Sequence, residues 1–275
     1  MRSLSSTALN IAIFVFFGNI STSALAETVR IGGTGAALGT MTMLAAAFQK
    51  AHPEHSVRVL PSLGTSGGLK ALQGRAIDVA VSARDINIEE KSAGLSAFKY
   101  GVTAFIFVSH PKSSAQSLTK ESLVDLYTGK QVNWANGQPV RLVLRPKGDS
   151  DTKQLIKFSP EVEAAVAEAH AKNGMTIAIT DTDAADQVEK TPGAFSTSTL
   201  SLVLSENRNF HILPFEGVTP SIATLNNGSY AHTKEMYVVI FATASTGTKE
   251  FLQFMRSSEG TEILKKTGHK VPARL

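Results

Sequence analysis

Three turns rich in glycine and hydroxyl side chains constrain this sequence most, because each stands directly before a helix-like segment. They are residues 33–37 (GTGAA), 64–68 (GTSGG) and 145–152 (RPKGDSDT). Strand-like segments at 28–31 and 57–60 precede the first two turns. A repeated order of strand, glycine turn and helix is typical of α/β proteins with parallel strands. The sequence therefore predicts an α/β fold.

Two continuous apolar runs later in the chain predict strands that are buried on both faces. They are residues 102–109 (VTAFIFVS) and 236–242 (MYVVIFA). A helix is predicted between them at residues 119–127, with Gly129 as its C-terminal stop. No linker rich in proline, glycine or serine divides the chain. Two lobes joined by crossing strands therefore fit the pattern better than two separate domains.

The first 26 residues have the order of a cleavable secretory signal. Arg2 gives a basic start, residues 8–20 are mostly apolar, and a run of small residues ends at Ala26. We therefore expect cleavage near Ala26 and a mature protein in a bacterial periplasm. The chain has no cysteine, which excludes disulfides, a thiolate nucleophile and Cys-ligated metals.

Charge and motif content narrow the function classes further. The net charge is only +4 and no basic run is present, so no nucleic-acid partner is expected. The seven histidines form no metal-binding motif, and His52 and His55 are predicted to lie in a solvent-exposed loop. The GTSGG turn is close to the GDSGG motif of serine proteases, but no matching histidine motif accompanies it. Neither a metal site nor an enzyme is therefore predicted.

Each of the three turns can hold part of a small oxyanion. Free N–H groups at a helix start point outward, and the helix dipole there favours negative charge. Glycine lets the anion approach the backbone, and Ser or Thr adds a hydroxyl donor. Arg145 can add a bidentate contact to two oxygens. The alternative is helix capping, since Ser66, Ser150 and Asp151 are ordinary N-cap residues; three such turns in one chain favour binding.

Several segments resemble those of one known family. Residues 118–130 (LTKESLVDLYTGK), followed by Trp134, match the most specific block of that family. Residues 64–69 match its GSSGG turn, residues 77–84 (IDVAVSAR) resemble a strand end, and residues 145–152 resemble its anion loop. The chain thus resembles the phosphate-binding proteins of ABC importers, a branch of the type II periplasmic binding proteins.

The resemblance implies two α/β lobes, each a mixed sheet flanked by helices, with a ligand cleft between them. Residues 27–108 and 236–275 would form lobe one, and residues 109–235 lobe two. A monomeric protein without a cofactor would bind phosphate and pass it to the membrane permease of an ABC importer. The residues that would form the anion site are Thr34, Gly35, Ala36, Ala37, Leu38, Thr65, Ser66, Gly67, Ser82, Arg84, Arg145, Ser150, Asp151 and Thr152.

The chain departs from the family pattern at positions that bear on ligand choice. Many phosphate binders have a hydroxyl at the position of Ala37, and an aspartate at that of Ala83 accepts the proton that phosphate carries and sulfate lacks. The third turn is one residue longer and contains DSDT. We expect Asp149 or Asp151 to supply the missing acceptor, unless Asp151 only caps the next helix. Molybdate, tungstate or a small organic anion remain alternative ligands, and a periplasmic sensor an alternative role.

Overall fold

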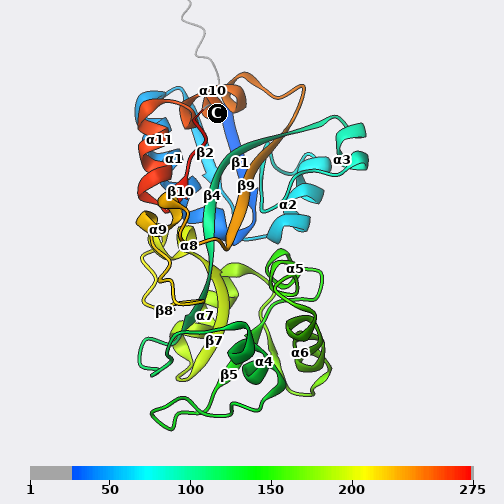
Figure 1. The fold of residues 1–275 in the computed structure, drawn as a ribbon. Helices are drawn as coiled ribbons and strands as arrows, with labels where there is room; N and C mark the ends of the chain where they lie inside the picture. Colours follow the sequence, from blue (N-terminus) through cyan, green and yellow to red (C-terminus); the bar gives the residue numbers. More distant parts are fainter. Residues whose placement is uncertain (1–26, 274–275) are drawn as a thin grey trace, which may run out of the picture.

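The computed structural model describes residues 27–273, so the predicted signal sequence lies outside the described part. The described residues form two lobes, one above the other in Figure 1, and the long strand β4 (Leu95–Ser109) runs through both. The strand order is β2-β1-β3-β9-β4-β7-β5-β6, and β8 and β10 also pair with β4. The sheet is mixed, because β1 is parallel to β2 and β3, whereas β9 (Thr233–Phe241) is antiparallel to β3 and β4. The predicted fold class is confirmed.

Lobe one contains the two strand, glycine turn and helix units that begin the described chain, and the C-terminal helices return to it (Figure 1). Besides its parts of β4 and β9, its elements are β1 (Glu27–Gly33), α1 (Gly35–Ala51), β2 (His55–Val59), α2 (Gly64–Gln73), β3 (Val79–Ser82), α3 (Ile88–Ser92), α10 (Thr246–Met255), α11 (Ser258–Lys266) and β10 (His269–Lys270). The apolar face of α1, which includes Met41, Leu44 and Phe48, is buried. These first units therefore form as the sequence predicts.

Lobe two is built on the far half of β4. Its elements are α4 (Lys120–Thr128), β5 (Arg141–Leu144), α5 (Ser150–Leu155), α6 (Pro160–Ala171), β6 (Thr176–Ile177), α7 (Asp181–Lys190), β7 (Ala194–Thr199) and β8 (His211–Leu213). Two short helices, α8 (Leu200–Ser205) and α9 (Ile222–Asn227), contact lobe one, α8 through α1 and α9 through β10. The lobes thus meet at helices as well as along the sheet.

Helix α4 shows how local sequence sets its ends. The Thr119 side chain accepts a hydrogen bond from the Ser122 N–H, and the Ser122 hydroxyl lies 2.7 Å from the Thr119 N–H, which makes a capping box. Gly129 ends the helix with φ 75°, a left-handed conformation that glycine adopts without a Cβ clash. The predicted helix and its stop are confirmed.

The two lobes have separate hydrophobic cores, and β4 contributes side chains to both. Lobe two has one buried cluster, to which β4 contributes Phe105 and Phe107. Lobe one has two clusters, and Tyr100 of β4 belongs to one of them. Lobe boundaries at residues 108 and 236 stay a prediction, since both β4 and β9 pass through the junction. Among residues 27–273, no helix is both long and apolar enough to span a bilayer.

Candidate functional site

A cavity of about 440 Å³ lies between the lobes and is lined from both sides. In Figure 1 it is where α2 of lobe one faces α5 of lobe two. The lining residues come from the second and third glycine turns, from the end of β3 and from the start of β9. They are Thr65, Ser66, Ala83, Arg84, Asp85, Gly148, Ser150, Lys153, Gln154, Lys157, Thr233, Lys234, Glu235 and Tyr237.

The second turn supplies the N-terminus of α2 to this cavity. The helix begins at Gly64, and its N-cap is Leu63, whose side chain makes no capping bond. The alternative that Ser66 caps this helix is therefore wrong, because Ser66 lies within the first turn and is exposed toward the cavity. Thr65 has a structural contact, since its Oγ1 accepts a hydrogen bond of 3.1 Å from the Ala83 N–H. The first-turn N–H groups and the Ser66 hydroxyl can therefore reach a ligand.

The end of β3 places Arg84 in the lining and turns Ser82 inward. The Ser82 hydroxyl donates to the Arg84 carbonyl at 2.6 Å and accepts from the Arg84 N–H at 3.2 Å. Ser82 is fully buried and is absent from the cavity lining. The Arg84 guanidinium makes two hydrogen bonds, of 2.7 and 2.8 Å, to the Glu90 carboxylate. Arg84 therefore lines the cavity with its charge already paired.

The first turn is occupied by a carboxylate from the other lobe. Asp181, the first residue of α7, accepts a 2.9 Å hydrogen bond from the Thr34 hydroxyl. The Ala36 N–H also stabilises the Asp181 carboxylate at the start of α1. A Cβ on Gly35 would stand 2.9 Å from Asp181 Cβ, so glycine permits the approach. The predicted anion position at Thr34–Leu38 thus holds an anion that belongs to the chain itself.

The third turn places Arg145 deep in the junction, where its residue is 3% exposed. Its Nη1 donates to the Ala178 carbonyl at 2.7 Å, and its Nη2 donates to Asp149 Oδ2 at 3.0 Å. Asp181 Oδ1 lies 3.7 Å from the same Nη2. Arg145 Nε is buried and has no partner among the described residues. One buried N–H of this charged group therefore has no acceptor within the described chain, although buried polar groups are normally paired.

The two aspartates of the third turn make different contacts within the chain. Asp149 is the N-cap of α5, since its Oδ1 accepts a 2.9 Å hydrogen bond from the Asp151 N–H. The capping alternatives for Ser150 and Asp151 are therefore wrong; the additional residue of this turn moves the cap to Asp149. Thr152 donates its hydroxyl to the Arg145 carbonyl at 3.1 Å and so holds the turn. Ser150 lines the cavity.

Asp151 forms a buried ion pair with Lys234, the second residue of β9. The two residues are 1% and 4% exposed, and the second carboxylate oxygen accepts a 3.1 Å hydrogen bond from the Thr197 hydroxyl. We call this set the ion cluster: Arg145, Asp149, Asp151, Asp181 and Lys234. It contains two cations and three carboxylates, so its formal charge is −1 when all are ionised.

The surroundings shift the pKa values of these groups from their ordinary values in different directions. Burial would raise the pKa of Asp181, but the charges of Arg145 and Lys234 outweigh it and lower that pKa. Burial would lower the pKa of Lys234, but the neighbouring carboxylates, Asp151 above all, raise it. Burial and the negative charge of Asp151 together raise the pKa of Asp149 to about 6. Asp149 is thus the member of the ion cluster that gains a proton near neutral pH.

Asp149→Asn is expected to raise the free energy of unfolding at pH 8, by on the order of 2 kcal/mol. The folded-state pKa of about 6 lies above the ordinary value of 3.8. The folded protein therefore holds this proton more tightly, and its stability falls as the pH rises from about 4 to about 6. Asparagine removes that penalty and still caps α5. Urea unfolding at pH 4.5 and pH 8 measures the difference.

The matched control for this prediction is Asp125→Asn, since the Asp125 side chain is half exposed in α4. The control is expected to leave the pH dependence of unfolding unchanged. An Asp149→Asn variant that is less stable than the parent at pH 8 contradicts the prediction and indicates that the ionised carboxylate stabilises the fold through Arg145.

The structure brings together only part of the predicted anion site. Thr65, Ser66, Arg84 and Ser150 line the cavity, whereas the other predicted residues lie behind it or in the first turn. Lys234 and Asp181 were not predicted. A lysine two residues before the apolar run at 236–242 was a usable signal for Lys234, because a charge entering a buried strand needs a partner. No sequence pattern distinguished Asp181 from an ordinary helix-start aspartate.

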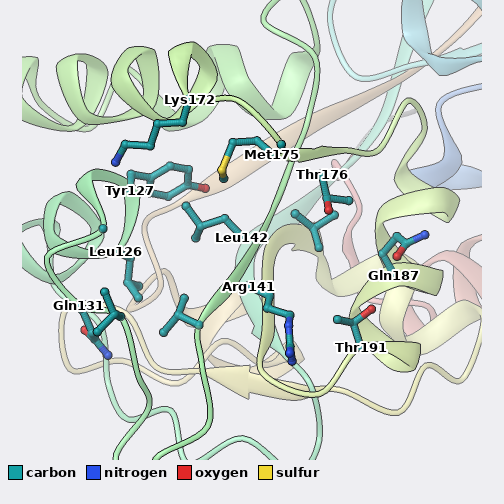
Figure 2. Close-up of a pocket in the computed structure, with 15 residues that line it drawn as sticks. Leu126, Tyr127, Gln131, Arg141, Leu142, Lys172, Met175, Thr176, Gln187 and Thr191 are labelled. Atoms are coloured by element: carbon teal, nitrogen blue, oxygen red, sulfur yellow. The ribbon is translucent and has the colours of Figure 1, made fainter.

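A second cavity, of about 390 Å³, lies within lobe two and contains none of the predicted site residues. Figure 2 shows it between α4, β5, β6 and α7, with Tyr127, Leu142 and Met175 among the labelled side chains. Lys172 and Arg141 also line it. This cavity is separate from the junction between the lobes.

Comparisons with known proteins are consistent with the two-lobed fold described above. A family model described as the PBP superfamily domain matches residues 20–259. The phosphate-binding protein PstS of Borreliella burgdorferi is 22% identical over 214 residues, which are 74% of this chain and 76% of that protein. PstS of Bacillus subtilis is 23% identical over 244 residues, which are 84% of this chain and 76% of that protein.

Among solved structures, one similar chain is a putative phosphate ABC transporter substrate-binding protein with bound phosphate from Clostridium perfringens. It is 22% identical, the match covers 90% of this chain and 100% of that one, and the TM-score is 0.74. This likeness shows a shared fold, and the family model covers most of the sequence. The chain therefore belongs to the PBP superfamily and has the two-lobed α/β fold of the type II periplasmic binding proteins.

Proposed function

We propose that this protein binds phosphate in the cavity between its lobes and delivers it to the membrane permease of an ABC importer. The observation that carries the proposal is the convergence of anion donors from both lobes on one cavity. Lobe one contributes the start of α2 with Ser66, and lobe two contributes Ser150. Lys234 lines the same cavity, and Arg145, at the start of the third turn, has a buried Nε–H without a partner among the described residues. The relatives named phosphate-binding protein PstS support phosphate as the anion.

The ion cluster bears on which anion binds. A phosphate that carries a proton needs an acceptor, and a carboxylate supplies one, whereas fully ionised sulfate is repelled by it. Both aspartates already accept two hydrogen bonds within the chain, Asp151 from Lys234 and Thr197, and Asp149 from Arg145 and the Asp151 N–H. They differ in exposure, since the Asp149 side chain is 13% exposed and the Asp151 side chain is 1% exposed. Asp149 borders the third turn and has a pKa of about 6, raised by burial and by Asp151. We therefore assign the acceptor role to Asp149 rather than to Asp151.

The cellular setting belongs to the same proposal. Residues 1–26 would direct export, with cleavage near Ala26, and the mature protein would act as a monomer in the periplasm. A binding protein needs no catalytic group, and the proposal includes none. The PBP superfamily match and the PstS relatives support a secreted solute-binding role.

Titration calorimetry on the anion-stripped protein tests the proposal with phosphate, sulfate, molybdate and tungstate. We expect phosphate to bind with a Kd of about 1 μM or tighter, and the other anions to bind at least about 100-fold more weakly. Ser66→Ala should weaken phosphate binding by about tenfold, because it removes one hydrogen bond to a charged ligand. Ser258→Ala, at the exposed first turn of α11, is the matched control.

Two results would reject parts of this proposal. Molybdate or tungstate binding more tightly than phosphate would mean that the fold is kept for another oxyanion. Equal phosphate and sulfate affinity in the parent protein would remove the need for a proton acceptor. Asp149→Asn then adds a direct comparison: loss of discrimination between phosphate and sulfate supports the acceptor role, and unchanged discrimination overturns it.

A further inference from the structure

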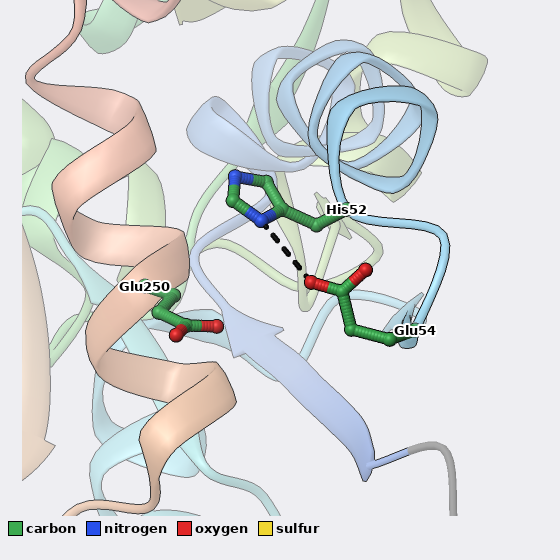
Figure 3. Close-up of side chains that lie close together, drawn as sticks. All are labelled: His52, Glu54 and Glu250. Carbon is green, nitrogen blue, oxygen red and sulfur yellow. Dashed lines mark ion pairs between the residues drawn. The ribbon is translucent and has the colours of Figure 1, made fainter. Parts of the chain in front are cut away.

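Two histidines and two glutamates gather at the end of α1 that lies farthest from the cleft. We call them the His–Glu cluster: His52, Glu54, His55 and Glu250. Figure 3 shows His52 and Glu54 beside the turn after α1, with Glu250 on the neighbouring helix α10. The 17 residues of α1 separate this cluster from the first turn by roughly 25 Å. It is therefore independent of the anion site.

The spacing of the ligand atoms suits a small metal ion. One atom each of His52, Glu54 and Glu250 lies within 4.8 Å of the other two. His52 Nδ1 and Glu54 Oε1 are 3.4 Å apart. A tetrahedral zinc ion with bonds of about 2.0–2.1 Å needs its ligands roughly 3.3 Å apart. One edge of such a site is thus already at the required length, and Glu250 needs only a side-chain adjustment.

The aromatic ring of Phe48 fixes both imidazoles. The His52 ring stacks on it with centroids 4.6 Å apart, and the His55 ring stacks at 5.9 Å. The His55 side chain is 11% exposed, so the expectation of a solvated histidine is wrong for this residue. His55 Nε2 lies 2.5 Å from Glu250 Oε2 and orients that carboxylate. Such oriented carboxylates are typical of built metal sites.

The carboxylates at this end of the lobe have no basic partner other than histidine. In the described chain, Glu54 pairs with His52, and Glu250 pairs with His55. A third carboxylate, Glu27, accepts a 3.0 Å hydrogen bond from the Gly247 N–H. No Lys or Arg of residues 27–273 forms a salt bridge with any of the three. These carboxylates therefore have no Lys or Arg within ion-pair distance among the described residues, and a divalent cation could pair with them.

We propose that the His–Glu cluster binds one divalent transition-metal ion of the zinc type. His52 Nδ1, Glu54 and Glu250 are the ligands, water completes the coordination, and His55 is a positioning residue that holds Glu250. Imidazole together with carboxylate suits zinc, whereas calcium and magnesium take oxygen ligands. The ion would link the end of α1 to α10 and so clamp lobe one. The proposal does not depend on phosphate binding.

Zinc titration of the untagged, EDTA-stripped protein in a phosphate-free buffer tests the proposal. We expect one Zn²⁺ per chain, a Kd at or below about 10 μM, and a higher Tm in the presence of zinc. His52→Ala and Glu250→Gln should each weaken binding at least tenfold, and His55→Gln should weaken it by about 10–100-fold. Co²⁺ bound to His55→Gln should keep the visible spectrum of the parent, because the ligands are unchanged.

His211→Ala in β8 of lobe two and Glu259→Gln in α11 are the matched controls, and zinc binding should be unchanged in both. Exposure of His52, Glu54 and Glu250 to solvent means that the ligand variants should fold, and their Tm without zinc checks this. The proposal is overturned by zinc that binds with more than one equivalent and no saturation. It is also overturned if His52→Ala and Glu250→Gln bind zinc as the parent does.

Discussion

Lys234→Met is expected to lower the free energy of unfolding by about 3–5 kcal/mol, because it leaves the carboxylate of Asp151 buried without its cation. Asp151 and Lys234 are almost fully buried, and the Thr197 hydroxyl alone would remain as a side-chain partner of the carboxylate. Methionine has nearly the length of lysine, so the expected loss of stability reflects the missing charge more than a change in packing volume. Urea unfolding at pH 7.5 measures the change.

The double variant Lys234→Met/Asp151→Asn distinguishes the effect of an unpaired buried charge from the effect of a change in packing volume. It removes both partners of the pair and should recover at least half of the lost stability, since replacing both charges of a buried pair costs much less than breaking it. Lys249→Met, on the exposed face of α10, is the control and should change the stability by less than about 0.5 kcal/mol. If the free energy of unfolding of Lys234→Met lies within about 1 kcal/mol of that of the parent, the prediction is contradicted.

Asp181→Asn is expected to tighten phosphate binding by about 30-fold. The Asp181 carboxylate lies at the start of α1 and 3.7 Å from Arg145 Nη2, so it adds a negative charge at the junction between the lobes, where phosphate is proposed to bind. If the two charges are taken to be about 8 Å apart, at an effective dielectric constant of about 20, they repel by about 2 kcal/mol. Asparagine can still accept the hydrogen bond from the Thr34 hydroxyl, so α1 keeps its partner. Calorimetric titration of parent and variant at the same salt concentration measures the change.

The opposite outcome for Asp181→Asn is equally informative. Weaker phosphate binding with unchanged sulfate binding would mean that Asp181, not Asp149, accepts the phosphate proton. Asp183→Asn is the matched control, because Asp183 lies two residues farther along α7 and its Oδ2 accepts from the Thr180 N–H in a capping box. The control should leave the affinity within about twofold, since an exposed charge is screened by solvent.

The elements of the fold could be predicted because their signals are local. The apolar run at 102–109 became the buried half of β4, and residues 119–127 became α4 with Gly129 at its end. The glycine turn at 64–68 became the start of α2, which lines the cavity. These outcomes depend on neighbours within a few residues, which periodicity and capping rules describe.

The contacts that complete the candidate site could not be predicted in this way. Asp181 meets Thr34 across 147 residues of sequence, and Lys234 meets Asp151 across 83. Tertiary packing decides both pairs, the packing of one lobe against the other for Asp181 and Thr34, and the packing of α5 against β9 for Asp151 and Lys234. The capping roles of Ser66 and Ser150 were wrong because each helix begins earlier than the predicted cap: α2 begins at Gly64, after Leu63, and Asp149 is the N-cap of α5.

The continuous strand β4 has a consequence for how the protein loses its structure. Its 15 residues pair with β9 and β10 in lobe one and with β7 and β8 in lobe two, and its side chains belong to the cores of both. Unfolding of either lobe would remove hydrogen-bond partners from β4, which is also part of the sheet of the other lobe. We therefore expect the two lobes to unfold as one cooperative unit with a single calorimetric transition, and the amides of β4 to exchange with solvent only when the whole molecule unfolds.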